Sequence, residues 1–172
     1  MVDPGWPLCV IDENDENRLV AAYRQIYLDE YVLADVRDWA DRRVRFHAPN
    51  FLHAFSEASN YRLSAGVHDV PVSLKRLQRI RWIKLALAGA GVQIEVLAQT
   101  RQDSRGRMKR RRSLIVLDNR YVVVLEPSEE EGFAFGFISA FPADQSYLDK
   151  IRRGATVLER RAGIKKPQSY GD

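Results

Sequence analysis

The sequence predicts an α+β fold in which N-terminal helices pack on a small antiparallel sheet of about four strands. Two observations lead to this fold class. Apolar residues recur with a helical period in the first half of the chain and alternate with polar residues after residue 91. The helices also precede the strands instead of alternating with them, which favours α+β over α/β. A chain of 172 residues, 45% of them hydrophobic, can bury one core, so we expect one domain.

A long N-terminal helix is the first expected element. The run Asp12-Glu13-Asn14-Asp15-Glu16 supplies side-chain acceptors and negative charge, which suit the exposed N–H groups of a helix start. Apolar residues then recur at near-helical spacing as far as Trp39, which predicts one helix, or two in tandem, over about 13–42. A short strand is expected next, at 44–46.

Two shorter helices are expected before the sheet. Pro49 is tolerated in a first helical turn and predicts a short helix that continues to about Ser59. Residues 60–71 contain glycine, aspartate and proline, which is typical of a loop. Ser73 is a suitable N-cap for a helix over 74–88, and two glycines then end that helix.

Alternating apolar and polar residues predict the sheet. Asp118-Asn119-Arg120 is a good hairpin connection between the second and third alternating segments. Residues 101–111 are expected to form a polar, basic loop, and residues 144–153 a C-terminal helix or turn. The four strands are expected at 92–98, 113–117, 121–125 and 133–141.

Charge divides the chain into an acidic beginning and a basic remainder. Residues 1–60 hold 6 Lys/Arg against 11 Asp/Glu, a balance of −5, whereas residues 61–172 hold 21 against 12, a balance of +9. We expect three regions: an acidic helical region over 1–43, an α+β domain over 44–154 and a basic, flexible tail over 155–172. The basic part would attract a polyanion such as nucleic acid.

Several classes of protein are not expected from this sequence. It has no apolar run of about 18 residues, and no basic N-terminal stretch followed by an apolar one, so we expect neither a membrane span nor a signal peptide. Cys9 is the single cysteine, which excludes an intramolecular disulfide and a cysteine metal cluster and fits a reducing, cytoplasmic setting. With no glycine-rich phosphate loop and no HExxH motif, no metal or other cofactor is expected.

His53 is the candidate acid or base. Cleavage of RNA without a metal needs a base for the 2′-OH proton and an acid for the leaving 5′ oxygen, and histidine can serve either role near neutral pH. His53 is expected on a short helix with apolar neighbours; a half-buried structural histidine is the alternative. His47, before the proline-led turn, is a weaker candidate, and His68 is expected to be exposed in a loop.

Cations on the helix over 74–88 are candidates for binding phosphate. Arg76 and Arg79 lie near the edge of its apolar stripe, and Lys84 follows on the same helix. Positive charge there could stabilise the charge that builds on phosphoryl oxygens. The alternative is an amphipathic helix whose cations face solvent.

A denser group of cations precedes the second strand. Residues 101–112 hold seven Lys/Arg and one acid, a common footprint of nucleic-acid binding, although a solvated loop would have the same composition. Arg110 and Arg111 are candidates for binding the substrate. Arg112, at the mouth of a strand, is better held by the sheet and is a candidate for catalysis.

Ser139 interrupts the last apolar strand. Alternation puts Phe137, Ser139 and Phe141 on one face of the sheet and the two residues between them on the other. A hydroxyl between two aromatic rings could donate to phosphate while the rings contact bases, with Phe141 as a substrate-binding residue. The alternative is a small residue that fits the core.

Five of these segments resemble, in order, motifs of the phage-associated Barnase–EndoU–colicin–RelE-like (BECR) nuclease superfamily. The resemblance spans roughly residues 44–154, leaves the acidic N-terminal region outside, and implies helices packed on a four-stranded antiparallel sheet. The segments are His53-Ala54-Phe55, residues 76–83, Arg112, residues 121–125 and residues 137–141.

The resemblance implies a metal-independent endoribonuclease of toxin type that cleaves tRNA or other cellular RNA, with an acidic antitoxin or immunity protein as a possible partner. In that enzyme His53 would transfer protons and Ser139 would position the scissile phosphate. The other roles implied are transition-state stabilisation by Arg79 and Arg112 and RNA binding by Arg76 and Lys84.

The chain departs from the family pattern at three positions. Ser139 replaces a threonine, which keeps the hydroxyl, and Phe141 replaces a tyrosine, which loses one; Leu77 replaces an alanine. Two other functions remain open: a non-catalytic nucleic-acid-binding protein, and a phage structural or interaction protein that acts through the helix over 13–42. DNA also remains open as the substrate.

Overall fold

The computed structural model describes residues 5–57, 72–89, 91–102 and 104–162. The predicted loop over 60–71, with His68, and the end of the predicted tail from residue 163 lie outside these residues. The helical elements are α1 (Glu16–Tyr27), the π-helix η1 (Leu28–Val32), the 3-10 helix η2 (Ala48–Asn50), α2 (Phe51–Phe55), α3 (Leu74–Gln78), α4 (Trp82–Ala88) and α5 (Gln145–Arg152). The strands are β1 (Val44–Arg45), β2 (Ile94–Gln102), β3 (Met108–Val116), β4 (Tyr121–Pro127), β5 (Phe135–Pro142) and β6 (Thr156–Arg161).

The described strands form one mixed sheet of six, so the expected antiparallel sheet of about four strands is wrong. Its order is β1-β5-β4-β3-β2-β6. The four expected strands are its antiparallel centre, β2 to β5. The short strand β1 adds a parallel pair to one end of β5, and β6 pairs with the outer edge of β2. The α+β class itself is retained.

Strand β6 consists of residues that the sequence assigned to a flexible tail. Its side chains are mostly exposed, including those of Val157 and Leu158, so they show no alternation of buried and exposed positions. Ion pairs explain why it joins the sheet. The buried carboxylate of Glu95 on β2 lies 3.0 Å from Nε of Arg152 on α5 and 3.3 Å from Nε of Arg160 on β6. A buried carboxylate needs such partners, and here they connect β6 and α5 to the sheet.

The N-terminal helix is shorter than the predicted 13–42. It begins at its cap residue Asp15, whose side chain accepts from the backbone N–H of Arg18, and it ends through η1 at Val32. The Asp38 side chain accepts hydrogen bonds from the backbone N–H groups of Ala40 and Arg42. Such side-chain bonds compete with helical ones and hold a loop in place of a second helix.

The predicted helix over 74–88 is divided into α3 and α4. At the division, the phenol of Tyr121 donates to the carbonyl of Arg79 at 3.3 Å, and the phenol of Tyr31 donates to the carbonyl of Ile80. These carbonyls are therefore bonded to side chains from β4 and η1. Both tyrosines are distant in sequence, so the helical pattern of residues 74–88 gives no sign of the break.

The β2–β3 hairpin is longer than predicted. Pairing continues outward to Gln102 and Met108, so most of the predicted basic loop over 101–111 is strand. The strands expected at 113–117 and 121–125 match β3 and β4, and the helix expected at 144–153 matches α5.

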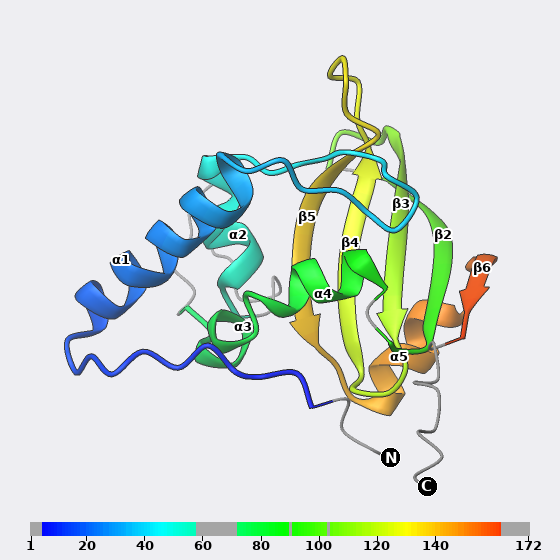
Figure 1. Ribbon diagram of the computed structural model, residues 1–172. Coiled ribbons are helices and arrows are strands. Elements are labelled where there is room, and N and C mark those ends of the chain that lie inside the picture. Colours follow the sequence, from blue (N-terminus) through cyan, green and yellow to red (C-terminus); the bar gives the residue numbers. More distant parts are fainter. Residues whose placement is uncertain (1–4, 58–71, 90, 103, 163–172) are drawn as a thin grey trace, which may run out of the picture.

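Apolar side chains pack on both faces of the sheet, and Figure 1 shows α4 on one side and α5 on the other. The larger core lies on the α4 side. It includes a group of aromatic rings from α1, η1, β1, α2 and β5, in which Phe46 stacks on Phe137 with ring centres 4.7 Å apart. The smaller core, between the sheet and α5, contains Leu97, Ile115, Val122, Leu148 and Ile151.

Candidate functional site

The outer edge of β5 is where the structure gathers several predicted site residues. Strand β1 pairs with only the first two residues of β5. Beyond them, Asn50 at the start of α2 donates hydrogen bonds from its amide to the carbonyls of Phe137 (3.2 Å) and Ile138 (2.9 Å). His53 is half-buried and lies one helical turn beyond Asn50, on the same side of α2. Helix α2 thus holds His53 beside β5.

Arg76 of α3 connects α2 with the far end of β5. Its Nη1 donates a hydrogen bond of 3.1 Å to the carbonyl of Ala54, and its guanidinium carbon lies 5.0 Å from the centre of the Phe141 ring. Burial lowers the pKa of Arg76, whereas the charges of Glu57 and Tyr147 act in the opposite direction. Arginine stays protonated in proteins, so a partly buried positive charge lies at this edge.

Ser139 and Phe141 share a face of the sheet, but Phe137 does not. The register of β4 with β5 shifts at one point: Leu125 pairs with Phe137, and the preceding Val124 pairs with Ser139. The extra residue in β5 is a bulge, which changes the face toward which the following side chains point. Phe137 therefore packs in the core on the α4 side and Phe141 in the core on the α5 side. The predicted alternation, with all three on one face, is wrong.

We call Asn50, His53, Arg76, Ser139 and Phe141 the β5-edge site. It offers an imidazole for proton transfer, a fixed cation for developing negative charge and a hydroxyl that can donate a hydrogen bond. That set suits the cleavage of a phosphodiester. Four of the nine predicted site residues lie on the segments that are joined at this edge: His53, Arg76, Ser139 and Phe141.

Helix α5 brings a further aromatic ring to this site. The Tyr147 ring meets Phe141 edge to face, with ring centres 5.6 Å apart, and Tyr147 is 41% exposed. The helix begins at Asp144, whose carboxylate accepts from the backbone N–H of Tyr147 (2.8 Å) and from the Ser146 hydroxyl (2.9 Å). This cap fixes the first turn of α5, which carries Tyr147.

The Asp144 cap predicts an acid dependence of stability. Its hydrogen bond from the Tyr147 backbone, and then that from Ser146, lower the pKa of Asp144. A lowered folded-state pKa adds stability above the ordinary value of about 3.9, and this stability is lost as the pH falls through the folded-state pKa. We expect Asp144→Asn to reduce the free energy of unfolding in urea at pH 7, and the difference from wild type to shrink as the pH falls below about 3.9.

The control for this prediction is Asp12→Asn, because Asp12 is exposed and makes no side-chain interaction with the described residues. A difference between wild type and Asp144→Asn that is the same at both pH values would contradict the assigned cap.

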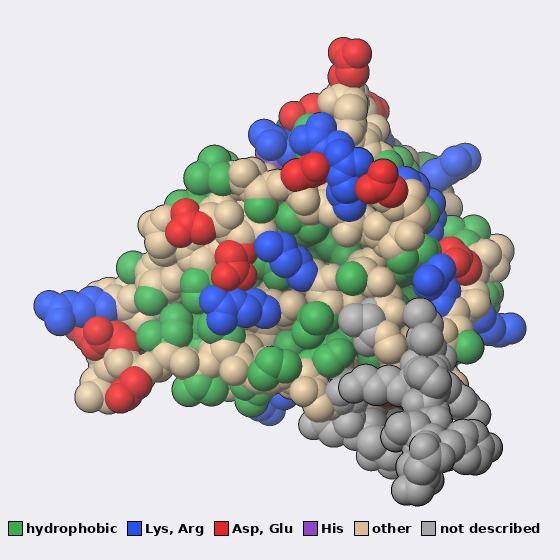
Figure 2. All heavy atoms as spheres, in the orientation of Figure 1, with side chains coloured by type: hydrophobic (Ala, Val, Ile, Leu, Met, Phe, Trp, Pro, Cys, Tyr) green, Lys and Arg blue, Asp and Glu red, His purple; other side chains and the backbone are tan. Residues whose placement is uncertain are grey.

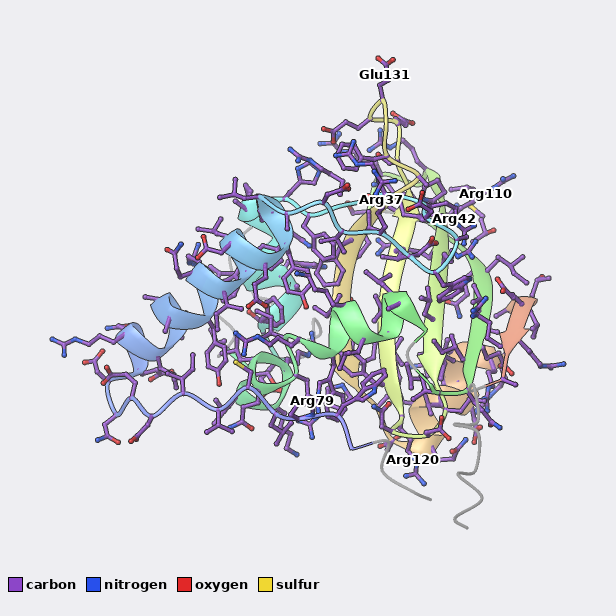
Figure 3. The ribbon with its side chains drawn as sticks, viewed as in Figure 1. Arg37, Arg42, Arg79, Arg110, Arg120 and Glu131 are labelled. Carbon is purple, nitrogen blue, oxygen red and sulfur yellow. The ribbon has the colours of Figure 1, made fainter. Side chains whose placement is uncertain are left out.

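Arg79 and Lys84 lie against aromatic rings outside the β5-edge site. The guanidinium carbon of Arg79 is 4.9 Å from the centre of the Trp82 ring, and Nζ of Lys84 is 5.2 Å from that of Tyr31. Arg79 also donates from Nη1 to the carbonyl of Lys75 at 2.9 Å. In Figure 3, Arg79 lies near the junction of α3 and α4. Both cations therefore pack against aromatic rings on the α4 side of the sheet.

The arginines of β3 point to opposite faces of the sheet. Arg112 alternates with the buried residues of the α4-side core, and its guanidinium carbon lies 4.9 Å from the centre of the Phe135 ring. Burial, and then the charge of Arg42, lower the pKa of Arg112. Ser139 lies on the other face. The sheet therefore separates two residues that the sequence analysis assigned to one catalytic site.

Arg111 is the β3 arginine on the same face as Ser139, since it alternates with Ile115 of the α5-side core. Its Nε is buried and has no hydrogen-bond partner within the described part of the chain. Arg110 is exposed, and Figure 3 shows it at the end of the sheet opposite Arg79. Of the predicted hairpin cations, Arg111 is the one that faces the site's side of the sheet.

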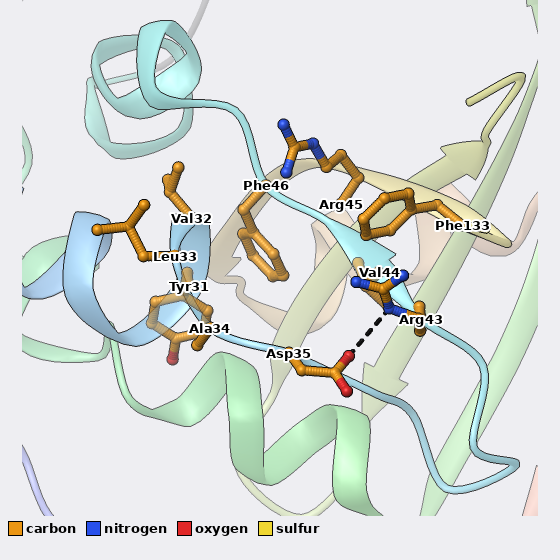
Figure 4. Close-up of a pocket in the computed structure, with 10 residues that line it drawn as sticks. All are labelled: Tyr31, Val32, Leu33, Ala34, Asp35, Arg43, Val44, Arg45, Phe46 and Phe133. Carbon is orange, nitrogen blue, oxygen red and sulfur yellow. Dashed lines mark hydrogen bonds and ion pairs between the residues drawn. The ribbon is translucent and has the colours of Figure 1, made fainter. Parts of the chain in front are cut away.

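A pocket of about 350 Å³ lies between η1 and β1 (Figure 4). Arg43 and Arg45 both lie on the Phe133 ring, at 4.3 and 5.3 Å from its centre. Nε of Arg43 is 3.0 Å from Asp35, and Nε of Arg45 is 3.4 Å from Glu130. Because carboxylates already pair with both cations, we assign no anion site to this pocket. Its lining residues are Tyr31, Val32, Leu33, Ala34, Asp35, Arg43, Val44, Arg45, Phe46 and Phe133.

Basic and acidic side chains are mixed on the visible surface around the β4–β5 turn (Figure 2). The end of the β2–β3 hairpin differs, since Arg105, Arg107, Lys109 and Arg110 are all exposed there and no acid lies between them in the sequence. This cationic hairpin end is a surface to which a polyanion can bind.

Neither a metal cluster nor a membrane-spanning helix is found in the described ranges. No group of three or more His, Cys, Asp or Glu side chains there could hold a metal ion. No helix in these ranges is long and apolar enough to cross a membrane.

The sequence analysis missed two residues of this region. The Asn50 side chain is not an acid or a base, so it was not a candidate for catalysis. Its place at a helix start, three residues before His53, is the feature that could have indicated a residue that orients the helix. Tyr147 was visible as the flank of an amphipathic helix whose buried residues are Leu148 and Ile151. Its approach to Phe141 depends on how α5 packs against the sheet, which no local pattern contains.

The fold and site together define an α+β protein with a mixed sheet and a histidine, arginine and serine around the edge of one strand. Comparisons with family models, curated proteins and solved structures found no match to this chain.

Proposed function

We propose that the protein is a metal-independent endoribonuclease of toxin type that cleaves RNA at the β5-edge site. The observation that carries the proposal is that the segments with His53, Arg76 and Ser139, which are far apart in sequence, are joined at one strand edge by Asn50 and Arg76. Proton transfer and charge stabilisation at a phosphodiester need these kinds of group close together. The proposal also includes a cytoplasmic location, tRNA as one candidate substrate, and an acidic inhibitor protein as a partner.

The reaction begins when the 2′ oxygen attacks the adjacent phosphorus. His53 takes the 2′-OH proton, and Arg76 stabilises the negative charge on the non-bridging oxygens. The Ser139 hydroxyl donates a hydrogen bond to the same oxygens. The bond to the 5′ oxygen then breaks, which leaves a 2′,3′-cyclic phosphate on one fragment and a 5′-OH on the other.

The cationic end of the β2–β3 hairpin binds the RNA backbone in this proposal. Arg110 and Arg111 contact phosphates outside the scissile bond, and affinity falls as salt rises because the contacts release counterions. Phe141 provides an apolar contact beside Arg76. The predicted roles of Arg79 and Arg112 in the transition state, and of Lys84 in RNA binding, stay predictions, since their side chains lie away from Ser139.

The test is incubation of the full chain with total cellular RNA in EDTA at several salt concentrations. We expect discrete fragments that end in 2′,3′-cyclic phosphate. Ser139→Ala, purified in the same way as a control for contaminating ribonuclease, should cleave about 10-fold or more slowly, because the loss of one oxyanion donor costs on the order of 10² to 10³. Equal cleavage by both proteins would assign the activity to a contaminant.

Intact RNA in every condition would overturn the nuclease proposal. Salt-dependent retention of intact RNA would then favour a non-catalytic binding protein that uses the cationic hairpin. With neither cleavage nor retention, a structural or interaction role for the acidic N-terminal region would remain.

A further inference from the structure

The β5-edge site contains one histidine, whereas the proposed reaction moves two protons. One proton leaves the 2′-OH, and another must reach the 5′ oxygen when its bond to phosphorus breaks. An alkoxide is a poor leaving group, so a positioned acid must protonate the 5′ oxygen as its bond to phosphorus breaks. If His53 takes the first proton, a second group at the site must donate the other.

Tyr147 is the group whose position and chemistry fit this role. Its ring packs edge to face on Phe141, and the guanidinium of Arg76 also lies against the Phe141 ring, so Arg76, Phe141 and Tyr147 form a continuous row. Tyr147 is 41% exposed, and its hydroxyl makes no hydrogen bond to the described residues. The phenol is thus accessible to a substrate that contacts Phe141.

The other proton donors near this site are less suitable. The Tyr121 phenol is fully buried and donates to the carbonyl of Arg79. Glu57 is exposed, and exposed carboxylates have already lost their proton near neutral pH. The Ser139 hydroxyl is a much weaker acid than a phenol. Tyrosine phenols keep their proton up to about pH 10 and therefore can donate it at neutral pH.

We propose that Tyr147 is the general acid of the reaction and protonates the leaving 5′ oxygen; this inference rests on the proposed nuclease function. The electron pair of the breaking P–O bond goes to the 5′ oxygen, which takes the phenol proton. The resulting phenolate is stabilised by Arg76, whose charge is electrostatically coupled to Tyr147. His53 then passes the proton that it took from the 2′-OH to the Tyr147 phenolate, directly or through water. Both residues thus return to their starting states, and no proton is gained or lost.

Several charged groups lie near Tyr147. They include Asp144 on α5, which accepts from the Tyr147 backbone, and Arg76 on α3. Glu57 after α2 acts on Arg76, and Arg120 in the β3–β4 turn acts on Asp144. The guanidinium carbon of Arg76 lies 5.0 Å from the centre of the Phe141 ring, so its positive charge lies beside the row of rings.

The test compares two leaving groups in a short RNA whose sequence contains a cleavage site mapped in total RNA. One version has the ordinary 5′ oxygen at the scissile bond, and the other has sulfur in its place. A thiolate leaves without protonation, so a variant that lacks the general acid recovers its rate on the sulfur substrate. Tyr147→Phe keeps the ring against Phe141 and is expected to fold.

We expect Tyr147→Phe to cleave the oxygen substrate about 10²-fold more slowly than wild type, a typical loss for a general acid, and the sulfur substrate at nearly the wild-type rate. His53→Ala should be slow on both substrates. A Tyr147→Phe protein that is as fast as wild type on oxygen, or equally slow on both substrates, overturns the role of Tyr147 while the nuclease function stands. Absence of wild-type cleavage overturns the nuclease function itself.

Discussion

Replacement of His53 by alanine is expected to lower the rate of RNA cleavage by 10²- to 10⁴-fold, the usual contribution of a positioned acid or base. His53 lies one turn beyond Asn50, whose amide fixes α2 to the β5 carbonyls at 2.9 and 3.2 Å. Removal of the imidazole leaves α2 anchored through Asn50 and through the buried side chains of Phe51, Ala54 and Phe55. The protein is therefore expected to remain folded, and the thermal unfolding midpoint separates any structural loss from the catalytic one.

The matched control is His47→Ala. His47 is more than half exposed, and its Nε2 lies 3.8 Å from Glu130 in the β4–β5 turn. It precedes η2 and is outside the β5-edge site. Rates should be measured in EDTA on an RNA with one mapped cleavage site, together with the thermal unfolding midpoint. Retained cleavage in His53→Ala, or an equal loss in His47→Ala, would contradict the assignment of the base.

Replacement of Arg76 by alanine is expected to be the second most damaging change, with a loss of cleavage on the order of 10² to 10³. Arg76 supplies the fixed positive charge of the site and also bonds the carbonyl of Ala54 at 3.1 Å. The variant loses both, and the loss of one hydrogen bond from a charged group lowers the free energy of unfolding by about 1.5–3 kcal/mol. Urea unfolding of the same preparation separates this structural part from the catalytic one.

Arg76→Lys divides the two roles further. Lysine keeps the charge but not the planar guanidinium, which here both reaches Ala54 and lies over Phe141, so we expect an intermediate rate. Arg81→Ala is the control, because Arg81 lies between α3 and α4 and pairs with Glu30 at 2.9 Å. Wild-type cleavage by a folded Arg76→Ala protein would remove Arg76 from the mechanism.

The central part of the fold could be read from the sequence because its signals are local. Apolar runs over 113–117 and 121–125, with a hairpin connection between them, predict β3 and β4, and each run is a local signal. The sequence also predicts a short strand at 44–46, which matches β1, but it gives no sign of the parallel pairing of β1 with β5. Strand β6 could not be predicted in this way, because its exposed residues show no buried face; the pairing of Arg160 and Arg152 with the buried Glu95 explains its place at the sheet edge.

The sequence predicted which kinds of residue form the candidate site, but not which individual residues come together there. His53, Arg76, Ser139 and Phe141 were identified from residue chemistry and from a family resemblance, and the structure brings them to one strand edge. Arg112 was assigned to the same site, yet strand alternation points it to the other face, over Phe135. Whether Arg111 or Arg112 faces the same side of the sheet as Ser139 depends on a shift of one residue in strand register. That register cannot be predicted from the sequence.

By itself, the sequence determined the α+β class, the acidic and basic halves of the chain and the main helical and strand segments, because hydrophobic period, capping residues and charge act over a few neighbouring residues. The tertiary structure alone decided which of these side chains meet. The bulge in β5 moved Ser139 and Phe141 to the α5 side, phenols from β4 and η1 divided the helix over 74–88, and the packing of α5 brought Tyr147 to Phe141. Each of these contacts joins residues that are distant in the chain, where no local pattern can specify the partner.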